Sequence, residues 1–209
     1  MKLAFIGIGN VGFALANNLQ RKGHDIVVAN DDPKSKSVMS ALERNSSFDV
    51  LAIQEAINAS EVIFLATPFK VNEALLAPLN FHGKTLVDCT NPVGPGISHG
   101  LESNSSGAEK IQEWAPSAKV VKAFTIYGFE NFSSPEYLNA AVKPAMLFAG
   151  NDVEAKTKVY QLIEASGFFA KDVGLLDQAL HLEHMTLLWV KMVRRDGHHP
   201  HFMWGYLEK

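Results

Sequence analysis

Three glycines near the N-terminus, Gly7, Gly9 and Gly12, have the spacing G-x-G-x-x-G. Gly7 would permit a tight turn, Gly9 would let the backbone approach a pyrophosphate, and Gly12 would let a following helix pack closely on a strand. The free N–H groups at the start of such a helix, here at Asn10 and Val11, favour a phosphate. A turn without a ligand could use the same spacing, but an apolar run precedes this one and helical spacing follows it. The segment therefore predicts dinucleotide binding.

Residues after the second apolar run bear on the choice between NAD and NADP. Asn30 and Asp31 end this run, and Lys34 and Lys36 follow shortly after. A carboxylate at this point bonds the ribose hydroxyls of NAD, whereas a cation accepts the 2′-phosphate of NADP. The acidic residues lean towards NAD, yet the two lysines could hold a 2′-phosphate or simply lie on a solvated turn. We predict NADP or NAD as the cofactor and leave the choice open.

Three further clusters of small and hydroxyl residues follow apolar runs that are typical of buried strands. Ligands of open α/β sheets bind outside the carboxyl ends of the strands. We therefore expect the first two clusters to bind the cofactor and the third to bind the substrate, with Asn91 able to bond a ribose hydroxyl. Tyr127 could contact a ring bound beside the cofactor, or it could pack in the core. The clusters are Ala66-Thr67-Pro68, Thr90-Asn91-Pro92 and Thr125-Ile126-Tyr127-Gly128.

The elements that must position these residues alternate between strand and helix along the chain. Apolar runs predict strands over 3–6, 25–29, 61–66, 85–88, 120–124 and 145–149, and helical spacing predicts helices after the glycine turn and over 108–114, 152–165 and 175–194. This alternation indicates an α/β, Rossmann-like, doubly wound, mostly parallel sheet with a C-terminal helical extension. We expect an NAD(P)-binding domain over residues 1–174, with residues 175–209 packed on it as one structural unit. Residues 92–107, rich in Gly, Ser and Asn, predict a mobile loop.

The composition excludes several classes of protein. The chain has 209 residues, with 19 Lys and Arg against 22 Asp and Glu, and a single cysteine, Cys89. One cysteine excludes an intramolecular disulfide and a multi-thiolate zinc site, and we expect a buried, inert thiol. The slightly acidic balance gives no field that would attract nucleic acid. Glycines interrupt the apolar N-terminus, and no apolar run reaches the ~20 residues of a membrane span. We expect a cytoplasmic protein with no membrane partner.

The histidines and the C-terminal aromatic residues offer two further candidate sites. His181 and His184 have helical i, i+3 spacing, and another three histidines lie at 198, 199 and 201. A zinc site needs three or four converging ligands, and no third ligand is evident beside the helical pair, so we predict no metal. Residues 202–206 include Phe202, Trp204 and Tyr206 and should dock. They would cover the protein's own core, line the substrate pocket or form a dimer interface.

Several of these segments together resemble the deazaflavin (coenzyme F420)-dependent NADP oxidoreductases. The resemblance lies in the glycine turn and in residues 66–69, 83–92, 120–124, 149–152 and 172–174, followed by the long helix. It implies a Rossmann-type domain that binds a nicotinamide cofactor and forms a homodimer. It also implies a second redox partner, a deazaflavin or flavin, near residues 124–128 and the C-terminal segment. The same fold is similar to the cytosolic domain of six-transmembrane metalloreductases, which pairs NADPH with a flavin.

The chain departs from this family at two places. Asn30-Asp31 stands where the family often has Ser-Arg, so the preference for NADP is not carried over. Phe124-Thr125-Ile126 stands where many relatives have an Asn, so the hydride acceptor is not carried over either.

These observations predict an NAD(P)-dependent oxidoreductase that transfers a hydride between a nicotinamide and a deazaflavin, flavin or similar ring acceptor. The cofactors carry this chemistry and the protein orients them and excludes water, so we assign no catalytic side chain. One alternative is a non-catalytic module that senses dinucleotides. Another is a small imine or carbonyl reductase of the pyrroline-carboxylate reductase or β-hydroxyacid dehydrogenase type. That alternative is less favoured because such enzymes add a large helical domain.

Overall fold

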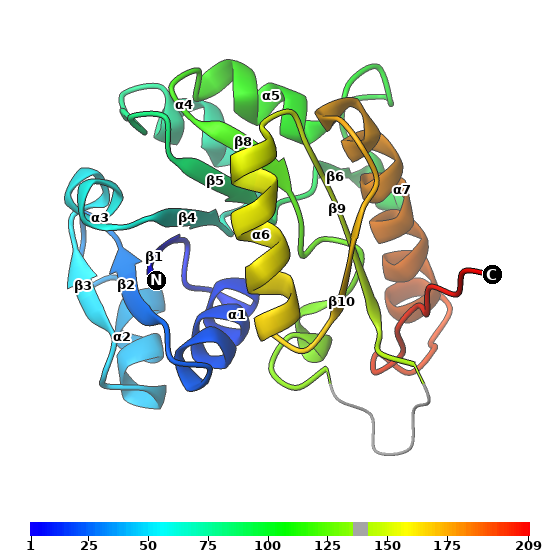
Figure 1. Ribbon diagram of the computed structural model, residues 1–209, viewed down its shortest axis with the longest axis horizontal. Coiled ribbons are helices and arrows are strands. Elements are labelled where there is room, and N and C mark those ends of the chain that lie inside the picture. Colours follow the sequence, from blue (N-terminus) through cyan, green and yellow to red (C-terminus); the bar gives the residue numbers. More distant parts are fainter. Residues whose placement is uncertain (136–141) are drawn as a thin grey trace.

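A computed structural model describes residues 1–135 and 142–209. In this part of the chain, the core is an eight-stranded sheet with the order β10-β9-β8-β5-β4-β1-β2-β3 (Figure 1). Each neighbouring pair is parallel except β8 and β9, which run antiparallel. The predicted doubly wound, mostly parallel sheet is therefore confirmed. The strands are β1 (Lys2–Ile6), β2 (Asp25–Ala29), β3 (Asp49–Leu51), β4 (Val62–Leu65), β5 (Thr85–Asp88), β8 (Lys119–Lys122), β9 (Ala145–Gly150) and β10 (Phe169–Asp172).

Helices cover both faces of the sheet, and each face has its own hydrophobic cluster. The side chains of β1 alternate between the clusters, with Leu3 and Phe5 in one and Ala4 and Ile6 in the other. A strand buried on both faces reads as an unbroken apolar run, which is why residues 3–6 show no polar alternation. The helices are α1 (Asn10–Arg21), α2 (Lys36–Arg44), α3 (Ile53–Ala59), α4 (Asn72–Leu76), α5 (Gly107–Trp114), α6 (Val153–Ala165) and α7 (Ala179–Val190).

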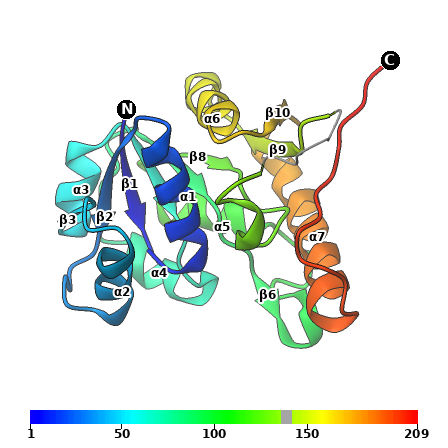
Figure 2. The same cartoon turned by 90° about the horizontal axis from the view of Figure 1, so that it is seen from below.

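The C-terminal segment is more broken than the sequence predicts. In place of one helix over 175–194, a 3-10 turn (Leu176–Gln178) leads into α7, and a π-helical turn (Lys191–Arg195) ends it. The aromatic tail then runs back along α7 (Figure 2) and docks on the protein's own core, where Phe202 stacks on Trp189. The Ala145 amide donates to the Trp204 carbonyl over 2.8 Å. The tail thus extends the hydrogen bonding at the start of β9.

Residues 92–107, for which the sequence predicts a mobile loop, contain a short hairpin. The hairpin pairs β6 (Val93–Gly94) with β7 (Ser98–His99), and it is closed by a 3-10 turn (Pro95–Ile97). The side chain of His99 is buried and ties the hairpin to α7. Gly96 has a φ of +64° in this turn, and the buried His99 anchors the hairpin.

Within residues 1–135 and 142–209, no helix combines the length and the apolar character that a membrane crossing requires.

Candidate functional site

The glycine turn connects the end of β1 to the start of α1. Gly7 has a φ of +93°, and a Cβ there would lie 2.7 Å from the backbone of Ala66 at the end of β4. A Cβ at Gly12 would lie 2.1 Å from the Gly7 carbonyl oxygen. A Cβ at Gly9 would meet no atom within 4 Å. Packing therefore requires glycine at positions 7 and 12, whereas Gly9 faces open space.

Among the residues that the structure describes, no side chain caps the N-terminus of α1 or neutralises its partial positive charge. Gly9 is the N-cap, no side chain caps the helix, and its first turn holds no acidic residue. The first amides of a helix, here beginning at Asn10 and Val11, have no carbonyl partner within the helix and carry a partial positive charge. Uncapped amides beside open space fit the pyrophosphate of a dinucleotide, so the residues present suit such a cofactor.

A cavity of about 520 Å³ lies beside Gly9, between the glycine turn and α2. Two cationic side chains line it, Lys36 and Arg44, and the Arg44 guanidinium lies 3.5 Å above the ring of Phe13. The lining contains no carboxylate. Its other residues are Ile8, Gly9, Asn10, Ser37, Ser40 and Ala41. An anionic group next to the pyrophosphate would therefore meet cations and hydroxyls here.

The polar residues at the end of β2 are engaged in local structure. Asp31 accepts a hydrogen bond from the Ile53 amide at the start of α3 over 2.9 Å. Asn30 accepts from the Asp32 amide over 2.8 Å. Asp32 in turn accepts from the amide of Lys34. Of the predicted residues Asn30, Asp31, Lys34 and Lys36, only Lys36 lines the cavity. The carboxylate that would favour NAD is thus held by the start of α3.

A second cavity, of about 430 Å³, lies where β4 and β5 end. Pro68 from the first strand-end cluster lines it together with Asn91 and Pro92 from the second. Phe69, Lys70 and the hairpin residues Val93, Gly94, Pro95 and Gly100 complete the lining. The structure therefore brings the two predicted clusters together at one sheet edge.

The other members of these clusters lie just behind the cavity. The Thr67 hydroxyl donates to the side chain of Asn72, and Ala66 lies against Gly7. Thr90 is buried, and its amide and hydroxyl donate to Asp88 over 2.9 and 2.7 Å. These residues therefore support the wall of the second cavity without lining it.

The third cluster reaches the second cavity through one side chain. The Thr125 hydroxyl donates to Asn91 Oδ1 over 2.6 Å. Ile126 and Tyr127 are buried in the core, where the Tyr127 hydroxyl donates to the Ala145 carbonyl and its ring stacks on Phe168. A Cβ at Gly128 would meet the Trp189 ring at 2.2 Å. Ile126, Tyr127 and Gly128 therefore lie in packing contacts and not along the cavity.

A buried charged cluster that the sequence did not predict lies behind the second cavity. The Lys122 ammonium, fully buried, lies 2.9 Å from Asp88 Oδ2 and 3.0 Å from Glu183 Oε1. It also donates to the carbonyl of Thr90. Charged residues within the apolar runs of β8 and α7 were the available signal, because a buried charge needs a partner. Sequence alone does not say that Lys122 and Glu183 face each other.

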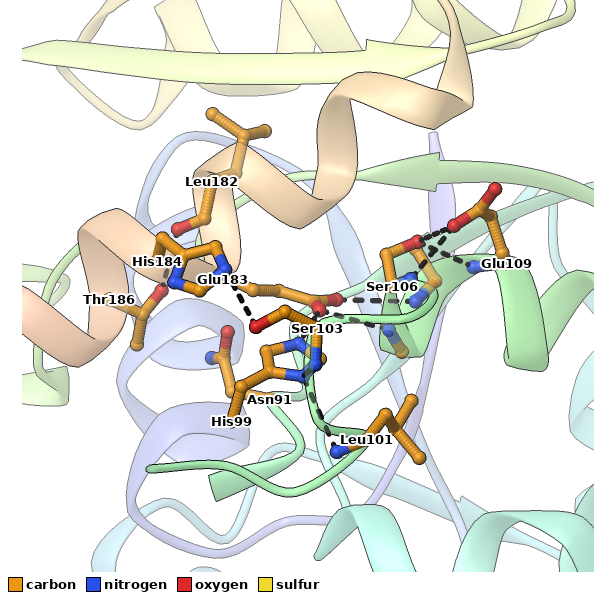
Figure 3. Close-up of polar contacts among 12 residues, drawn as sticks. Asn91, His99, Leu101, Ser103, Ser106, Glu109, Leu182, Glu183, His184 and Thr186 are labelled. Carbon is orange, nitrogen blue, oxygen red and sulfur yellow. Dashed lines mark hydrogen bonds and ion pairs between the residues drawn. The ribbon is translucent and has the colours of Figure 1, made fainter. Parts of the chain in front are cut away.

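Glu183 joins α7 to two other segments (Figure 3). Its Oε2 accepts from the Gly107 amide over 2.9 Å and lies 2.9 Å from His99 Nε2, and its Oε1 accepts from the Ala108 amide. His99 Nδ1 accepts from the backbone amides of Leu101 and Ser103, so Nε2 carries the proton towards Glu183. One carboxylate therefore caps α5, anchors the hairpin and pairs with Lys122.

Opposing effects set the pKa values of this cluster. Burial on its own would raise the pKa of Glu183, but Lys122, His99 and the Gly107 amide outweigh it and hold that pKa below its usual range. Burial would lower the pKa of Lys122, but the carboxylates of Asp88 and Glu183 outweigh it and raise that pKa. Glu183 and Lys122 are therefore both charged at neutral pH.

The lowered pKa of Glu183 predicts an acid-sensitive contribution to stability. A depressed folded-state pKa stabilises the fold above the ordinary Glu pKa of about 4.3, and that contribution is lost as the pH falls from there through the lowered value. We expect Glu183→Gln to be less stable at pH 7 and to lose less stability than the wild type between pH 7 and pH 3. Urea unfolding at both pH values measures this, with the exposed Glu113→Gln as the matched control. Equal acid losses in Glu183→Gln and the wild type would contradict the assignment.

The histidines do not form a ligand set. His184 is exposed, stacks on His99 at 5.4 Å and lies 3.1 Å from the Ser103 hydroxyl. His199 and His201 lie side by side in the tail, with their ring centres 5.2 Å apart. No three His, Cys, Asp or Glu side chains converge as metal ligands within the described ranges 1–135 and 142–209.

Comparison with known proteins shows what the chain is similar to. Residues 2–92 match the family described as NADP oxidoreductase, coenzyme F420-dependent. The chain is 30% identical over 189 residues to the metalloreductase STEAP3 of Rattus norvegicus, an alignment that covers 89% of this chain and 36% of the relative. It is 32% identical over 98 residues to 2-hydroxy-3-oxopropionate reductase of Escherichia coli (strain K12), covering 44% of this chain and 32% of the relative. The chain spans about a third of the length of these curated relatives.

Two solved structures share the fold. One, from Arthrobacter sp. FB24 and described as a candidate F420-dependent NADP-reductase, is 24% identical with a TM-score of 0.83 and covers 100% of both chains. The other, a reductive aminase from Aspergillus terreus in complex with NADPH and ethyl levulinate, is 20% identical with a TM-score of 0.65 and covers 92% of this chain and 61% of the aminase. Over residues 2–92 the chain is similar to the coenzyme F420-dependent NADP oxidoreductase family, and its fold is of the Rossmann type.

Proposed function

We propose that this protein transfers a hydride between NADP(H) and a flat ring acceptor such as a deazaflavin or flavin. The observation that carries the proposal is the order of features along one sheet edge. A cationic cavity, the open glycine turn and a largely apolar cavity follow one another from α2 across β1 to β4 and β5. That order matches the 2′-phosphate and the pyrophosphate of an extended dinucleotide, followed by a cavity where the nicotinamide and the ring acceptor would meet. The ring acceptor, a homodimer and a cytoplasmic location belong to this proposal, and the family resemblance supports them.

The chain's own residues would bind and orient the reactants. The first amides of α1 would hold the pyrophosphate, and Lys36 and Arg44 would hold the 2′-phosphate. Phe69 and Pro92 wall the second cavity and exclude water from it. A bound nicotinamide supplies the hydride itself. Positioning two rings face to face accounts for most of the rate enhancement that the protein has to provide.

Anaerobic oxidation of NADPH, followed at 340 nm, tests the proposed function. We expect turnover with riboflavin, FMN or 8-hydroxy-5-deazaflavin, and none with pyrroline-5-carboxylate or small keto acids. Absence of NADPH binding at millimolar concentration would overturn the proposal. Tight NADPH binding without oxidation by any ring would favour the dinucleotide-sensing module instead.

The cationic cavity predicts a preference for NADPH over NADH. Charge-assisted hydrogen bonds contribute about 1.5–3 kcal/mol each, so Lys36→Ala and Arg44→Met should each weaken NADPH binding by roughly tenfold or more. NADH lacks the 2′-phosphate, and its Kd should stay within about threefold. Fluorescence titration with both dinucleotides measures this.

Lys34→Ala is the matched control for the cationic cavity. It removes the same charge two residues away, in the turn before α2, but Lys34 lies outside the cavity lining. Equal losses of NADPH affinity in Lys34→Ala and Lys36→Ala would show a diffuse electrostatic effect and contradict a defined 2′-phosphate site.

A further inference from the structure

The amide of Asn91 has one polar group engaged and one free. Thr125 Oγ1 lies 2.6 Å from Asn91 Oδ1, a separation typical of O–H···O and shorter than N–H···O bonds usually are. The amide oxygen therefore faces Thr125, and the NH2 group faces the other way. Within residues 1–135 and 142–209, no protein acceptor takes a hydrogen bond from Asn91 Nδ2. Asn91 lines the 430 Å³ cavity, so this NH2 group is a donor available to a ligand.

Thr125 is held in place by α7 and by an unusual backbone turn. Its side chain is buried, and its hydroxyl lies 3.2 Å from that of Thr186. Thr186 also donates to the Thr125 carbonyl over 2.8 Å. The preceding residue, Phe124, has a φ of +53°, a left-handed conformation that costs a bulky residue about 1 kcal/mol or more. The fold retains this strained turn where β8 ends, and the turn sets the position of the Thr125 hydroxyl.

The backbone on the other side of Asn91 is fixed as well. Asp88 accepts from both the amide and the hydroxyl of Thr90, and Lys122 donates to the Thr90 carbonyl. Because the residue before Asn91 and the end of its side chain are both held, the NH2 group needs little reorganisation to meet a ligand. A donor fixed in advance binds more strongly than one that must be ordered on binding.

The rest of the cavity indicates what this donor meets. Pro68, Phe69 and Pro92 give apolar walls that suit a planar ring, and a volume of about 430 Å³ lies within the range of small-ligand pockets. Lys70, an exposed cation, lies on the lining. The chemistry therefore fits a planar heterocycle with a carbonyl oxygen for Asn91 and an anionic substituent for Lys70.

We propose that Asn91 selects the ring acceptor by donating a hydrogen bond to its carbonyl oxygen, with Thr125 as the positioning residue for the Asn91 amide. This inference rests on the proposed function, since it concerns the acceptor side of the same site. An oxygen of the dinucleotide could accept the same hydrogen bond. The test therefore separates binding of NADPH from use of the ring.

The experiment compares variants with riboflavin and FMN as acceptors, which differ by one phosphate. Asn91→Leu should raise the KM for both rings about tenfold while the Kd of NADPH changes by less than about threefold. Thr125→Val should give a smaller rise in the same parameter, and Thr125→Ser, which keeps the hydroxyl, should restore the wild-type KM. Lys70→Ala should raise the KM for FMN and leave that for riboflavin unchanged.

The outcomes separate this inference from the proposed function. If the wild type reduces the rings and neither Asn91→Leu nor Thr125→Val changes their KM, the inference fails and the function stands. A rise in the Kd of NADPH without a change in ring KM would assign Asn91 to the dinucleotide and overturn its role towards the ring. If the wild type reduces no ring, the function fails. Quenching of riboflavin fluorescence by the NADP⁺-saturated protein then decides the inference, and absence of quenching in the wild type overturns it.

Discussion

Replacing Gly9 by Asp is expected to abolish NADPH binding while the protein stays folded. Gly9 faces open space and has extended backbone angles, so an aspartate side chain fits without a clash. Asp is a better N-cap than Gly by a few tenths of a kcal/mol, because its carboxylate accepts from the first free amides of the helix. The same carboxylate would occupy the pyrophosphate position and would repel the negatively charged pyrophosphate. We expect a loss of at least about a hundredfold in NADPH affinity, since like charges brought together cost several kcal/mol.

Thermal unfolding and NADPH titration test this prediction. In Gly9→Asp, thermal stability should rise slightly, whereas NADPH affinity should fall. The control is Gly12→Ala, whose Cβ would lie 2.1 Å from the Gly7 carbonyl oxygen. That overpacking should destabilise the fold by about 1–3 kcal/mol. A Gly9→Asp protein that binds NADPH like the wild type would refute the assignment of the glycine turn.

Lys122→Met is expected to destabilise the protein by about 3–5 kcal/mol, since it leaves the buried carboxylates of Asp88 and Glu183 without their cation. Methionine fills a similar volume, so the loss reports the charge and not a cavity. Urea unfolding at pH 7 measures it. Combining Lys122→Met with Asp88→Asn and Glu183→Gln removes the unpaired charges and should recover part of the loss.

The matched control is Lys110→Met. It is also a Lys→Met substitution that breaks an ion pair with a carboxylate, but the pair with Glu113 lies on the surface. Both side chains of that pair are substantially exposed, so the expected cost is below about 1 kcal/mol. A cost for Lys122→Met no larger than that of the control would show that the buried cluster contributes little to stability.

The sheet could be predicted from the sequence wherever its strands are buried on both faces. Residues 3–6, 26–29 and 62–65 are unbroken apolar runs, and each proved to lie in a strand. By contrast, β3 has only three residues, and α2 buries only Val38 and Ala41. Neither element was predicted from the sequence, because a short edge strand and a largely exposed helix leave almost no periodic pattern of apolar residues.

The candidate site could also be predicted only in part from the sequence. Sequence position placed Asn91 and Thr125 at one sheet edge, since parallel strands bring their carboxyl ends together. It could not show that Thr125 donates to Asn91, nor that Tyr127 points into the core. Lys36 was identified, whereas its neighbour Arg44 was missed because it lies two helical turns further along α2. Side-chain direction depends on tertiary packing, which strand ends alone do not specify.

The capping of α5 by Glu183 bears on how the chain folds as it leaves the ribosome. The Gly107 amide takes its acceptor from a residue 76 positions later in the sequence. Because chains are made from the N-terminus, these amides must stay hydrated until α7 has emerged, and the hairpin that carries His99 lacks its anchor for the same time. The packing of α5 and of the hairpin is therefore completed only after α7 has been synthesised.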